Sequence, residues 1–464
     1  MIKPWAHQEA AVDFALLHKG VLWDHDMGVG KTISAILLAQ KMSAKKILIL
    51  CPKSVVPVWS KEFNKFCKSE FNILGLDKGS VKKKGESIEK FLNAQQHQKK
   101  VVVINFESAW REGLGETRKN GRISNKGLLR SIKWDLIIVD ECHKIAHSSS
   151  KISKFCGRLA LATKKIVGLS GTPLPNGCLS AHGLCRTLKN DLFDKSEYRF
   201  RMKYAQFGGF ENREVIEFIN QEDFKQKFAS ITHTVKAEEV IELPNVTHIN
   251  RNVNLSPKAM KMYKEFQEEC ILEINDGIIT AENVLVKYLR LAMIASGSVK
   301  DEEGVTHHLD NSKIEAVKDI VDGLPKTEPI IVFGRFVDEI KRAKEILIKD
   351  HYTCSELSGS VNELANWQAG ETQILIMNIQ AGAVGIDCTR ARYCIYLSTG
   401  YSYVQYSQSL ARVCRPGADL TKKIFYYHIN ANHTIDEKIT KALNDKEDII
   451  ETLLNEMRVY QKAA

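Results

Sequence analysis

A glycine-rich segment near the amino terminus has the composition of a phosphate-binding loop. Asp26-Met27-Gly28-Val29-Gly30-Lys31-Thr32 opens an apolar-periodic stretch that predicts a helix over Lys31–Lys41. Such a turn presents backbone N–H groups and the positive end of the helix dipole to phosphates. Lys31 is then expected to reach the β and γ phosphates, and the Thr32 hydroxyl to bind Mg²⁺. The strict pattern has glycine where this chain has His25, so an ordinary glycine turn remains the alternative.

An acidic pair follows the apolar run LIIV. Asp140 at the end of this predicted strand can hold Mg²⁺ through water, and Glu141 can orient and deprotonate an attacking water molecule. Taken alone, the pair is also compatible with a solvated strand end. Together with Lys31 and Thr32, it indicates a nucleoside triphosphatase.

Buried strands alternate with helices around these groups. Continuous apolar runs predict four strands in the first part of the chain: Lys45–Pro52, Lys99–Phe106, Trp134–Glu141 and Lys164–Gly171. Helical periodicity then dominates from Leu174 to Val299, most clearly in Pro257–Asp276 and Ala281–Ala295. Four more runs follow: Pro329–Phe336, Thr372–Ile379, Ala391–Ser398 and Lys422–Ile429. A last helix is predicted from Thr434 to about Gln461.

This alternation predicts the α/β class, with two parallel sheets flanked by helices. We expect three parts: residues 1–175 as the first sheet domain, 176–305 as a mainly helical insertion, and 306–464 as the second sheet domain with a carboxyl-terminal helix.

The charge distribution favours a polyanionic partner for the first part. The 464 residues carry 66 basic and 56 acidic side chains, a net charge of +10. Residues 1–175 hold 30 basic and 15 acidic side chains, a net +15, and the remaining 36 and 41 give −5. The 11 cysteines include no Cys-x-x-Cys pair, and neither a signal peptide nor a membrane-spanning run is evident. These features predict a soluble intracellular protein.

The order of the motifs resembles the Swi/Snf-type ATPase family within the superfamily-two helicases. KPWAHQ resembles the Q motif, WDHDMGVGKT motif I, CPKSVVPVWSKEF motif Ia, DECH motif II and GLSGTPLPN motif III. In the second half, IIVFGRF resembles motif IV, QAGAVGIDCTRA motif V and QSLARVCRPG motif VI. The resemblance covers Pro4 to about Leu454 and implies two tandem RecA-like domains. It also implies that ATP lies between the two sheet domains, so that hydrolysis would require closure.

The resemblance also implies roles for particular residues. Gln8 would read adenine, and Gly385 and Asp387 would lie on the nucleotide side of motif V. Arg412 and Arg415 would be arginine fingers that reach the γ-phosphate, although their spacing alone also fits a solvated helical face. The residues implied in coupling hydrolysis to domain movement are His143, Ser170 and Thr172. Those implied in contacting the nucleic-acid backbone are Lys53, Ser54 and Gln380.

Several positions depart from the family pattern. The usual Arg-Arg pair is replaced in His233-Thr234-Val235-Lys236, and Asp387 stands where Asn is usual. Motif VI has Cys414 and Pro416 at positions where His and a branched residue are common. The length leaves no room for bromodomain, chromodomain or SANT-like domains. We therefore expect a minimal phage- or bacterial-type DNA translocase rather than a nucleosome remodeller.

Three other segments have less specific signals. Arg111–Arg130 is basic and contains Asn120-Gly121, which predicts a hairpin whose Arg118, Lys119 and Arg122 contact DNA; a solvated loop is the alternative. Lys82–Lys84 is expected to be solvated surface. His307-His308 is not expected to bind metal, because adjacent side chains without a cysteine or carboxylate in ligand geometry make poor ligands.

The sequence thus predicts a DNA-dependent ATPase that uses ATP and Mg²⁺ to translocate on duplex or branched DNA, with little sequence preference. Fork regression or branch migration is the expected activity. A strand-separating DNA or RNA helicase and a nucleotide-switched DNA clamp remain alternatives, and RNA is the less favoured partner. We expect a monomeric motor without a membrane partner, in a bacterial or phage-infected cytoplasm, or in the nucleus of a eukaryote.

Overall fold

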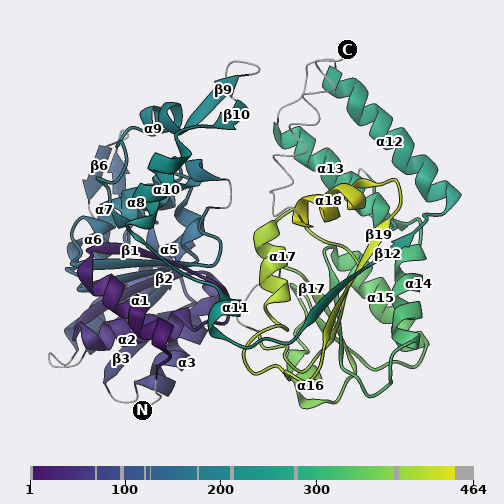
Figure 1. Ribbon diagram of the computed structural model, residues 1–464, viewed down its shortest axis with the longest axis horizontal. Helices are drawn as coiled ribbons and strands as arrows, with labels where there is room; N and C mark the ends of the chain where they lie inside the picture. The colour runs from purple at the N-terminus through teal and green to yellow at the C-terminus, as the bar shows by residue number, and fades with distance from the viewer. Residues whose placement is uncertain are drawn as a thin grey trace. The chain divides into compact units, whose positions relative to one another are not determined.

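Two compact units make up the chain, Met1–Ile241 (unit 1) and Glu242–Ala464 (unit 2). The computed structural model (Figure 1) describes residues 4–67, 70–94, 99–115, 117–119, 122–125, 127–174, 177–208, 214–275, 281–301, 303–380 and 386–444. Each unit has its own sheet and its own helices, and the two sheets confirm the predicted α/β class.

Unit 1 is built on a seven-stranded sheet in which all neighbouring strands are parallel. In spatial order, its strands are β11 (Thr232–Val235), β1 (Gly20–His25), β8 (Lys165–Ser170), β7 (Leu136–Asp140), β2 (Lys46–Cys51), β4 (Lys99–Asn105) and β3 (Phe71–Leu76). The apolar runs that predicted β2, β4, β7 and β8 are almost wholly buried, as expected for parallel strands covered on both faces. These four predictions are confirmed.

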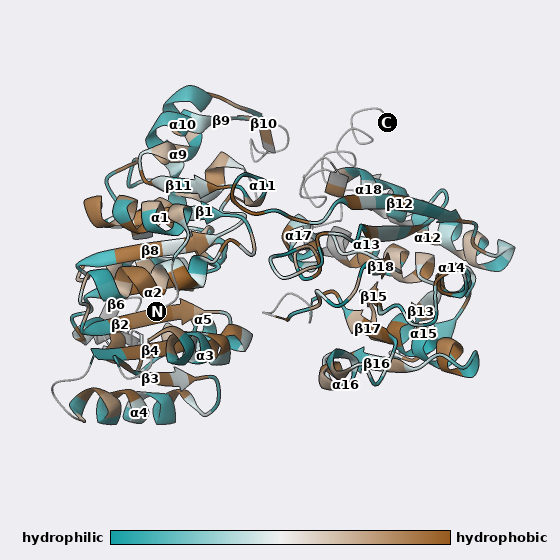
Figure 2. Ribbon diagram, turned by 60° about the horizontal axis from the view of Figure 1, so that its bottom comes forward, coloured by the Kyte–Doolittle hydropathy of each residue, from teal (hydrophilic) through white to brown (hydrophobic). Residues whose placement is uncertain are grey.

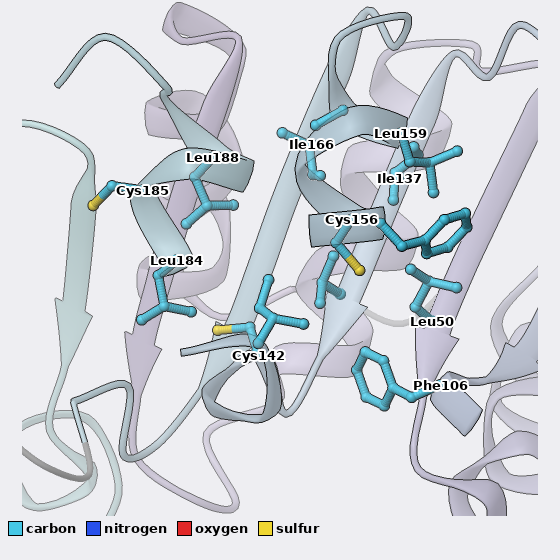
Figure 3. Close-up of a cluster of buried hydrophobic side chains, with 14 of the residues drawn as sticks. Leu50, Phe106, Ile137, Cys142, Cys156, Leu159, Ile166, Leu184, Cys185 and Leu188 are labelled. Carbon is cyan, nitrogen blue, oxygen red and sulfur yellow. The ribbon is translucent and has the colours of Figure 1, made fainter. Parts of the chain in front are cut away.

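Helices cover both faces of this sheet, and alternate residues of each strand enter different clusters. In β2, Leu48 and Leu50 pack on one side, whereas Ile47 and Ile49 pack on the other. Figure 3 shows part of the first cluster, in which strand residues meet residues of α7 and α8. The helices are α1 (Ala6–Leu17), α2 (Lys31–Lys41), α3 (Val56–Phe66), α4 (Val81–Asn93), α5 (Phe106–Ala109), α6 (Gly127–Ser131), α7 (Lys151–Ala160), α8 (Ala181–Leu188), α9 (Glu197–Tyr204), α10 (Gln221–Ala229) and α11 (Ala237–Val240). The short 3-10 helices are η1 (Lys53–Val55), η2 (Cys142–Ile145) and η3 (Cys178–Ser180).

The middle of the chain contains more strand than its helical periodicity predicted. β9 (Ala205–Gly208) and β10 (Glu214–Phe218) form an antiparallel pair, while β11 and β12 (Val246–Val253) are edge strands of the two sheets. The division between units falls inside this region, between Ile241 and Glu242. The division into three parts therefore stays a prediction.

The predicted basic hairpin is present. β5 (Thr117–Lys119) and β6 (Arg122–Asn125) pair antiparallel, with Lys119 opposite Arg122. The turn residues Asn120 and Gly121 lie outside the described residues, as do the side chains of both strands. The backbone therefore confirms the hairpin, and its contact with DNA stays a prediction.

Unit 2 contains a six-stranded sheet that is also parallel throughout. Its order is β12, β19 (Ile424–Ala431), β18 (Tyr393–Tyr396), β15 (Ile330–Gly334), β17 (Ile374–Asn378) and β16 (Cys354–Leu357). The four strands predicted for this half are confirmed. A short pair, β13 (Ser298–Lys300) and β14 (Thr306–His308), lies outside the sheet.

The helices of unit 2 include both long helices predicted from periodicity. They are α12 (Pro257–Asn275), α13 (Ala281–Ala295), α14 (Ser312–Asp322), α15 (Val337–Lys349), α16 (Leu364–Ala369), α17 (Tyr403–Leu410) and α18 (Ile435–Asn444). The predicted final helix begins as α18, and its continuation beyond 444 lies outside the described residues. No helix among the described residues is long and apolar enough to cross a bilayer. Figure 2 shows hydrophobic colour along strands such as β2 and hydrophilic colour on surface helices such as α10.

One surface prediction is wrong. Lys82 and Lys83 are exposed on α4, but Lys84 is buried and its ammonium donates to Asn105 Oδ1 at 2.9 Å and Ser108 Oγ at 3.0 Å. Lys84 lies on the same face of α4 as Ile88, four residues on, and this face packs against the sheet. Burial lowers the pKa of Lys84, and its two polar partners offset the loss of hydration.

Candidate active site

Three neighbouring strands of unit 1 bring the predicted catalytic segments to one edge of the sheet. β1, β8 and β7 are adjacent and parallel, with Asp24 paired to Ser170 and Leu169 paired to Asp140. Because the carboxyl ends of parallel strands share an edge, the glycine-rich loop, the acidic pair and the GLSGTP segment converge there. This is the edge at which open α/β sheets bind their ligands.

The loop after β1 requires glycine at two positions. Gly28 has φ +84° and Gly30 has φ +88°, in the left-handed region that side chains disfavour. Gly30 is also the residue before α2, whose first N–H groups have no partners within the helix. The loop therefore ends where the positive pole of a helix dipole is directed out of the helix, as an anion site requires.

Gln8 is buried against this loop. Its Nε2 donates to Val29 O at 3.2 Å, its Oε1 accepts from Trp5 N at 3.0 Å, and a Cβ on Gly30 would lie only 2.3 Å from Nε2. His7 Nε2 also bonds Val29 O, at 2.8 Å. The segment resembling a Q motif thus contacts the loop backbone directly, while its reading of adenine stays a prediction.

Lys31 is held by backbone carbonyls of its own loop. Its Nζ donates to His25 O at 2.7 Å and Asp26 O at 3.0 Å. A Cβ on Gly171 would lie 3.8 Å from the same Nζ, so the ammonium lies beside the end of β8. Burial lowers the pKa of Lys31, and the nearby carboxylates of Glu141 and Asp140 oppose that shift.

The acidic pair has an unusual environment. Asp140 Oδ2 accepts from the indole Nε1 of Trp59 at 2.8 Å, and Oδ1 accepts from Glu141 N at 3.0 Å. Burial, followed by the charge of Glu141, raises the pKa of Asp140 to about 6. Glu141 itself has φ +53°, a strained conformation for a side chain of its kind and one that functional sites often contain.

A chain of polar contacts leaves the acidic pair. His143 Nδ1 lies 3.2 Å from Glu141 Oε2 and 3.4 Å from Ser170 Oγ, which in turn accepts from Thr172 N at 3.1 Å. The structure therefore brings together the three residues predicted to couple hydrolysis to movement and connects them to the predicted general base.

Carboxylates outnumber ammonium groups at this edge. Asp24, Asp26, Asp140 and Glu141 all influence Lys31, and burial raises the pKa of Asp24 as it does that of Asp140. Oxygen ligands of this kind suit Mg²⁺, which would offset the acidic excess. Within the described residues, no three His, Cys, Asp or Glu side chains form a metal-binding group by themselves. The donor set therefore fits a cation that is held jointly with phosphates.

The predicted residues of unit 2 are joined within that unit. Cys388 N, next to Asp387, donates to Arg412 O at 3.1 Å, so the segments resembling motifs V and VI contact each other. Burial opposes a low pKa for Asp387, but hydrogen bonds from Thr389 and the charge of Arg415 keep it below its usual value. Gly385 lies outside the described residues.

The predicted nucleic-acid contacts lie at the surface. Lys53 and Ser54 are exposed in η1, which follows β2, and Gln380 is exposed just after β17. Each comes at the carboxyl end of a parallel strand. Their binding role stays a prediction.

Sequence reasoning missed two partners of the site. Trp59 lies in the segment resembling motif Ia. A buried indole N–H needs a hydrogen-bond acceptor, and this was the only indication in the sequence that Trp59 has a polar partner. His25 Nε2 pairs with His233 Nδ1 at 2.9 Å, from β1 to β11. Both histidines stand where the sequence departs from the expected patterns, but a contact between residues 208 positions apart has no local sequence signal.

Comparisons with known proteins identify related chains. The SNF2-related domain model matches residues 7–299, and the helicase conserved C-terminal domain matches residues 312–417. An uncharacterised ATP-dependent helicase of Mycoplasma genitalium is 27% identical over 95% of this chain, which spans 41% of that protein's length. An uncharacterised ATP-dependent helicase of Bacillus subtilis is 23% identical over 95% of this chain and 77% of its own length.

Two further similarities come from a phage and an archaeon. A putative protein of Acyrthosiphon pisum secondary endosymbiont phage 1 is 24% identical over 68% of this chain and 72% of its own length. The solved SWI2/SNF2 ATPase core of Sulfolobus solfataricus in complex with double-stranded DNA is 20% identical, with a TM-score of 0.44 over 97% of this chain and 93% of its own.

The packing of Gln8 against Gly30 can be tested by a stability measurement. Gly30→Ala is expected to lower the free energy of unfolding by more than the 1–2 kcal/mol or so that a left-handed alanine costs, because the new Cβ also displaces the Gln8 amide. Gly79→Ala is the matched control, since Gly79 has φ +91° and its Cβ would meet only Lys83 Cβ, at 3.9 Å. Urea unfolding of both variants compares them, and equal losses of stability would contradict the packing argument.

Proposed function

The chain belongs to the SNF2-related family, and from that premise we propose that it hydrolyses ATP to move along duplex or branched DNA. The observation that carries the proposal is the convergence at one sheet edge of a glycine-rich loop with Lys31 and an acidic pair, Asp140 and Glu141. A loop that binds phosphates and a carboxylate that can activate water are the two components that triphosphate hydrolysis needs.

The positions of the described residues support separate roles in phosphate binding, proton transfer and coupling. Backbone N–H groups at the start of α2 and the Lys31 ammonium bind the phosphates. Glu141 accepts the proton of the attacking water, and His143 Nδ1 lies 3.2 Å from its Oε2. Release of phosphate would shift Glu141 and, through His143, Ser170. We propose that this series of contacts couples hydrolysis to movement of the two units.

Thr32 and Asp140 are the residues that would hold Mg²⁺ together with ATP. The ion supplies neutralisation of phosphate charge. Trp59 fixes the Asp140 carboxylate by a hydrogen bond of 2.8 Å, so the ligand is oriented before a cation arrives.

We further propose that Arg412 and Arg415 act on the same ATP. Their segment is fixed within unit 2 by the bond from Cys388 N to Arg412 O. Hydrolysis that requires groups from both units couples turnover to relative movement of the units. Repeated movement of the units, while they are bound to phosphates of the DNA backbone, would advance the protein along the DNA.

The substrate proposal rests on charge. Residues 1–175 have a net charge of +15, and the exposed Lys53 and Ser54 follow a strand of the same sheet as the site. Contacts to phosphates read little sequence, so we propose binding to DNA of any sequence with a steep salt dependence. Fork regression or branch migration is the finer activity that we propose, in the cytoplasm of a bacterial or phage-infected cell.

A single ATPase assay tests the function. Turnover is expected to rise with duplex DNA and to rise further with forked DNA, compared with single-stranded DNA and RNA. Glu141→Gln should lower kcat by roughly 10²- to 10⁴-fold because it removes the general base, and Lys31→Ala should abolish stimulation. Stimulation by RNA alone would overturn the choice of substrate, and slow hydrolysis unaffected by any nucleic acid would indicate a clamp.

The pH dependence of turnover tests the role of Asp140. Its raised pKa means that in the free enzyme the carboxylate becomes protonated as the pH falls through about 6, so binding of the cation, and with it kcat/KM for MgATP, should fall there. Trp59→Phe removes a hydrogen bond that stabilises the charged form. It should therefore raise the pKa and move the acid limb of the profile toward neutral pH.

Trp134→Phe is the control for that experiment. Trp134 is equally buried, and its indole donates to Leu129 O at 2.9 Å, away from the acidic pair. Its profile should match the wild type. An unchanged profile for Trp59→Phe would show that Asp140 does not set the acid limb.

The β5–β6 hairpin generates a separate prediction. Replacing Arg118, Lys119 and Arg122 with Gln should weaken binding to forked DNA and reduce the dependence of log K on log salt, by about 0.9 for each phosphate that these side chains neutralise. The matched variant replaces Lys82, Lys83 and Lys90, three exposed lysines of α4, with Gln. Fluorescence anisotropy at several salt concentrations compares the two, and equal effects would rule out a specific role of the hairpin in binding.

A further inference from the structure

The end of β1 is bound through its side chains to the edge strand β11. The His25 ring is fully buried, stacks on Trp23 at 5.7 Å with an interplanar angle of 8°, and pairs through Nε2 with His233 Nδ1 at 2.9 Å. Burial, and then the neighbouring His233, lowers the pKa of His25 to about 2, and Lys31 and His7 act in the same direction. The ring is therefore neutral and places no second positive charge beside Lys31.

Asp26 strengthens the same attachment. Its N donates to Val235 O at 2.9 Å, its Oδ2 accepts from Ala237 N at 3.0 Å, and Lys236 Nζ lies 3.5 Å from Oδ1. Together with the histidine pair, these bonds attach both His25 and Asp26 to residues 233–237.

These same two residues supply the carbonyls that hold Lys31. An ammonium has three N–H donors, and here two are directed to His25 O and Asp26 O. The direction of the third donor is thereby fixed, and it is the donor that a phosphate can engage. Any shift of His25 and Asp26 moves these two acceptor oxygens and so reorients the ammonium.

We propose that His233 and Asp26 are positioning residues for Lys31, because they fix the carbonyls that orient its ammonium toward the phosphates of ATP. The inference rests on the proposed function and assigns roles that the motifs do not. It also connects the phosphate site to the chain that leaves unit 1, because residues 233–237 come just before Ile241, where unit 1 ends. A displacement of residues 233–237 would therefore change how the Lys31 ammonium is directed toward the phosphates.

The test measures the Kd for MgATP, kcat and thermal stability in matched variants. His233→Phe keeps a ring and loses the hydrogen bond, so the Kd should rise about tenfold, the effect of one buried hydrogen bond. His233→Asn places a polar group near the position of Nδ1 and should restore most of the affinity. His182→Phe is the control: His182 is another buried histidine of unit 1, and its ring bonds Asp194 O at 3.0 Å, away from the loop. It should lower stability and leave the Kd unchanged.

Asp26 gives a second pair of variants if His233→Phe does not fold. Asp26→Ala loses the acceptor for Ala237 N and should raise the Kd, whereas Asp26→Asn retains an acceptor oxygen and should raise it less. Equal Kd values for wild type, His233→Phe and Asp26→Ala would overturn the inference while leaving the proposed function intact. A wild type that binds but does not hydrolyse ATP would overturn the proposed function, and the Kd series would still decide the inference. A wild type that neither binds nor hydrolyses ATP would overturn both.

Discussion

The partly buried positive charge of the Lys31 ammonium is the constraint on which the candidate site of unit 1 depends. A buried charge must be paired and hydrogen-bonded, or it loses its proton. Lys31 satisfies this requirement with two carbonyl oxygens from its own loop and with the carboxylates at the ends of β1 and β7. Those groups can surround it only because β1, β8 and β7 are adjacent and parallel, so that the sheet order itself is part of the site.

At the same edge, the carboxylates of Asp24, Asp26, Asp140 and Glu141 outnumber the ammonium groups of Lys31 and Lys236 that act on them. Burial raises the pKa values of Asp24 and Asp140 above their usual range, and the charge of Lys31 opposes that shift in both. We propose that a ligand that brings a cation along with its own phosphates would stabilise this site. Glu141, the proposed general base, has a strained backbone, and such strain persists only where the surrounding structure holds it.

The sequence was informative where local rules apply and silent where distant residues meet. Eight strands could be predicted because strands buried on both faces are apolar throughout. The interior strand β1 was not predicted, although its GVLW run is apolar and buried. The edge strands β11 and β12 were not predicted, since THTV and VTHINRNV are polar and half-solvated and have no apolar run. The prediction for Lys84 was wrong because a charge run suggests solvent, whereas helix geometry turns one of its three lysines inward. The loop, the acidic pair and their common edge were visible in the motifs, but the contacts of His233 and Trp59 depend on the folded sheet.

We propose that Lys31 and the acidic pair form a binding site for ATP with a divalent cation. Isothermal titration of the full chain with a non-hydrolysable ATP analogue, with and without Mg²⁺, measures this binding. We expect one site per chain, binding that strengthens markedly with Mg²⁺, and loss of that Mg²⁺ effect in Asp140→Asn. Binding that is equally tight without the cation, or unchanged in Asp140→Asn, would contradict it.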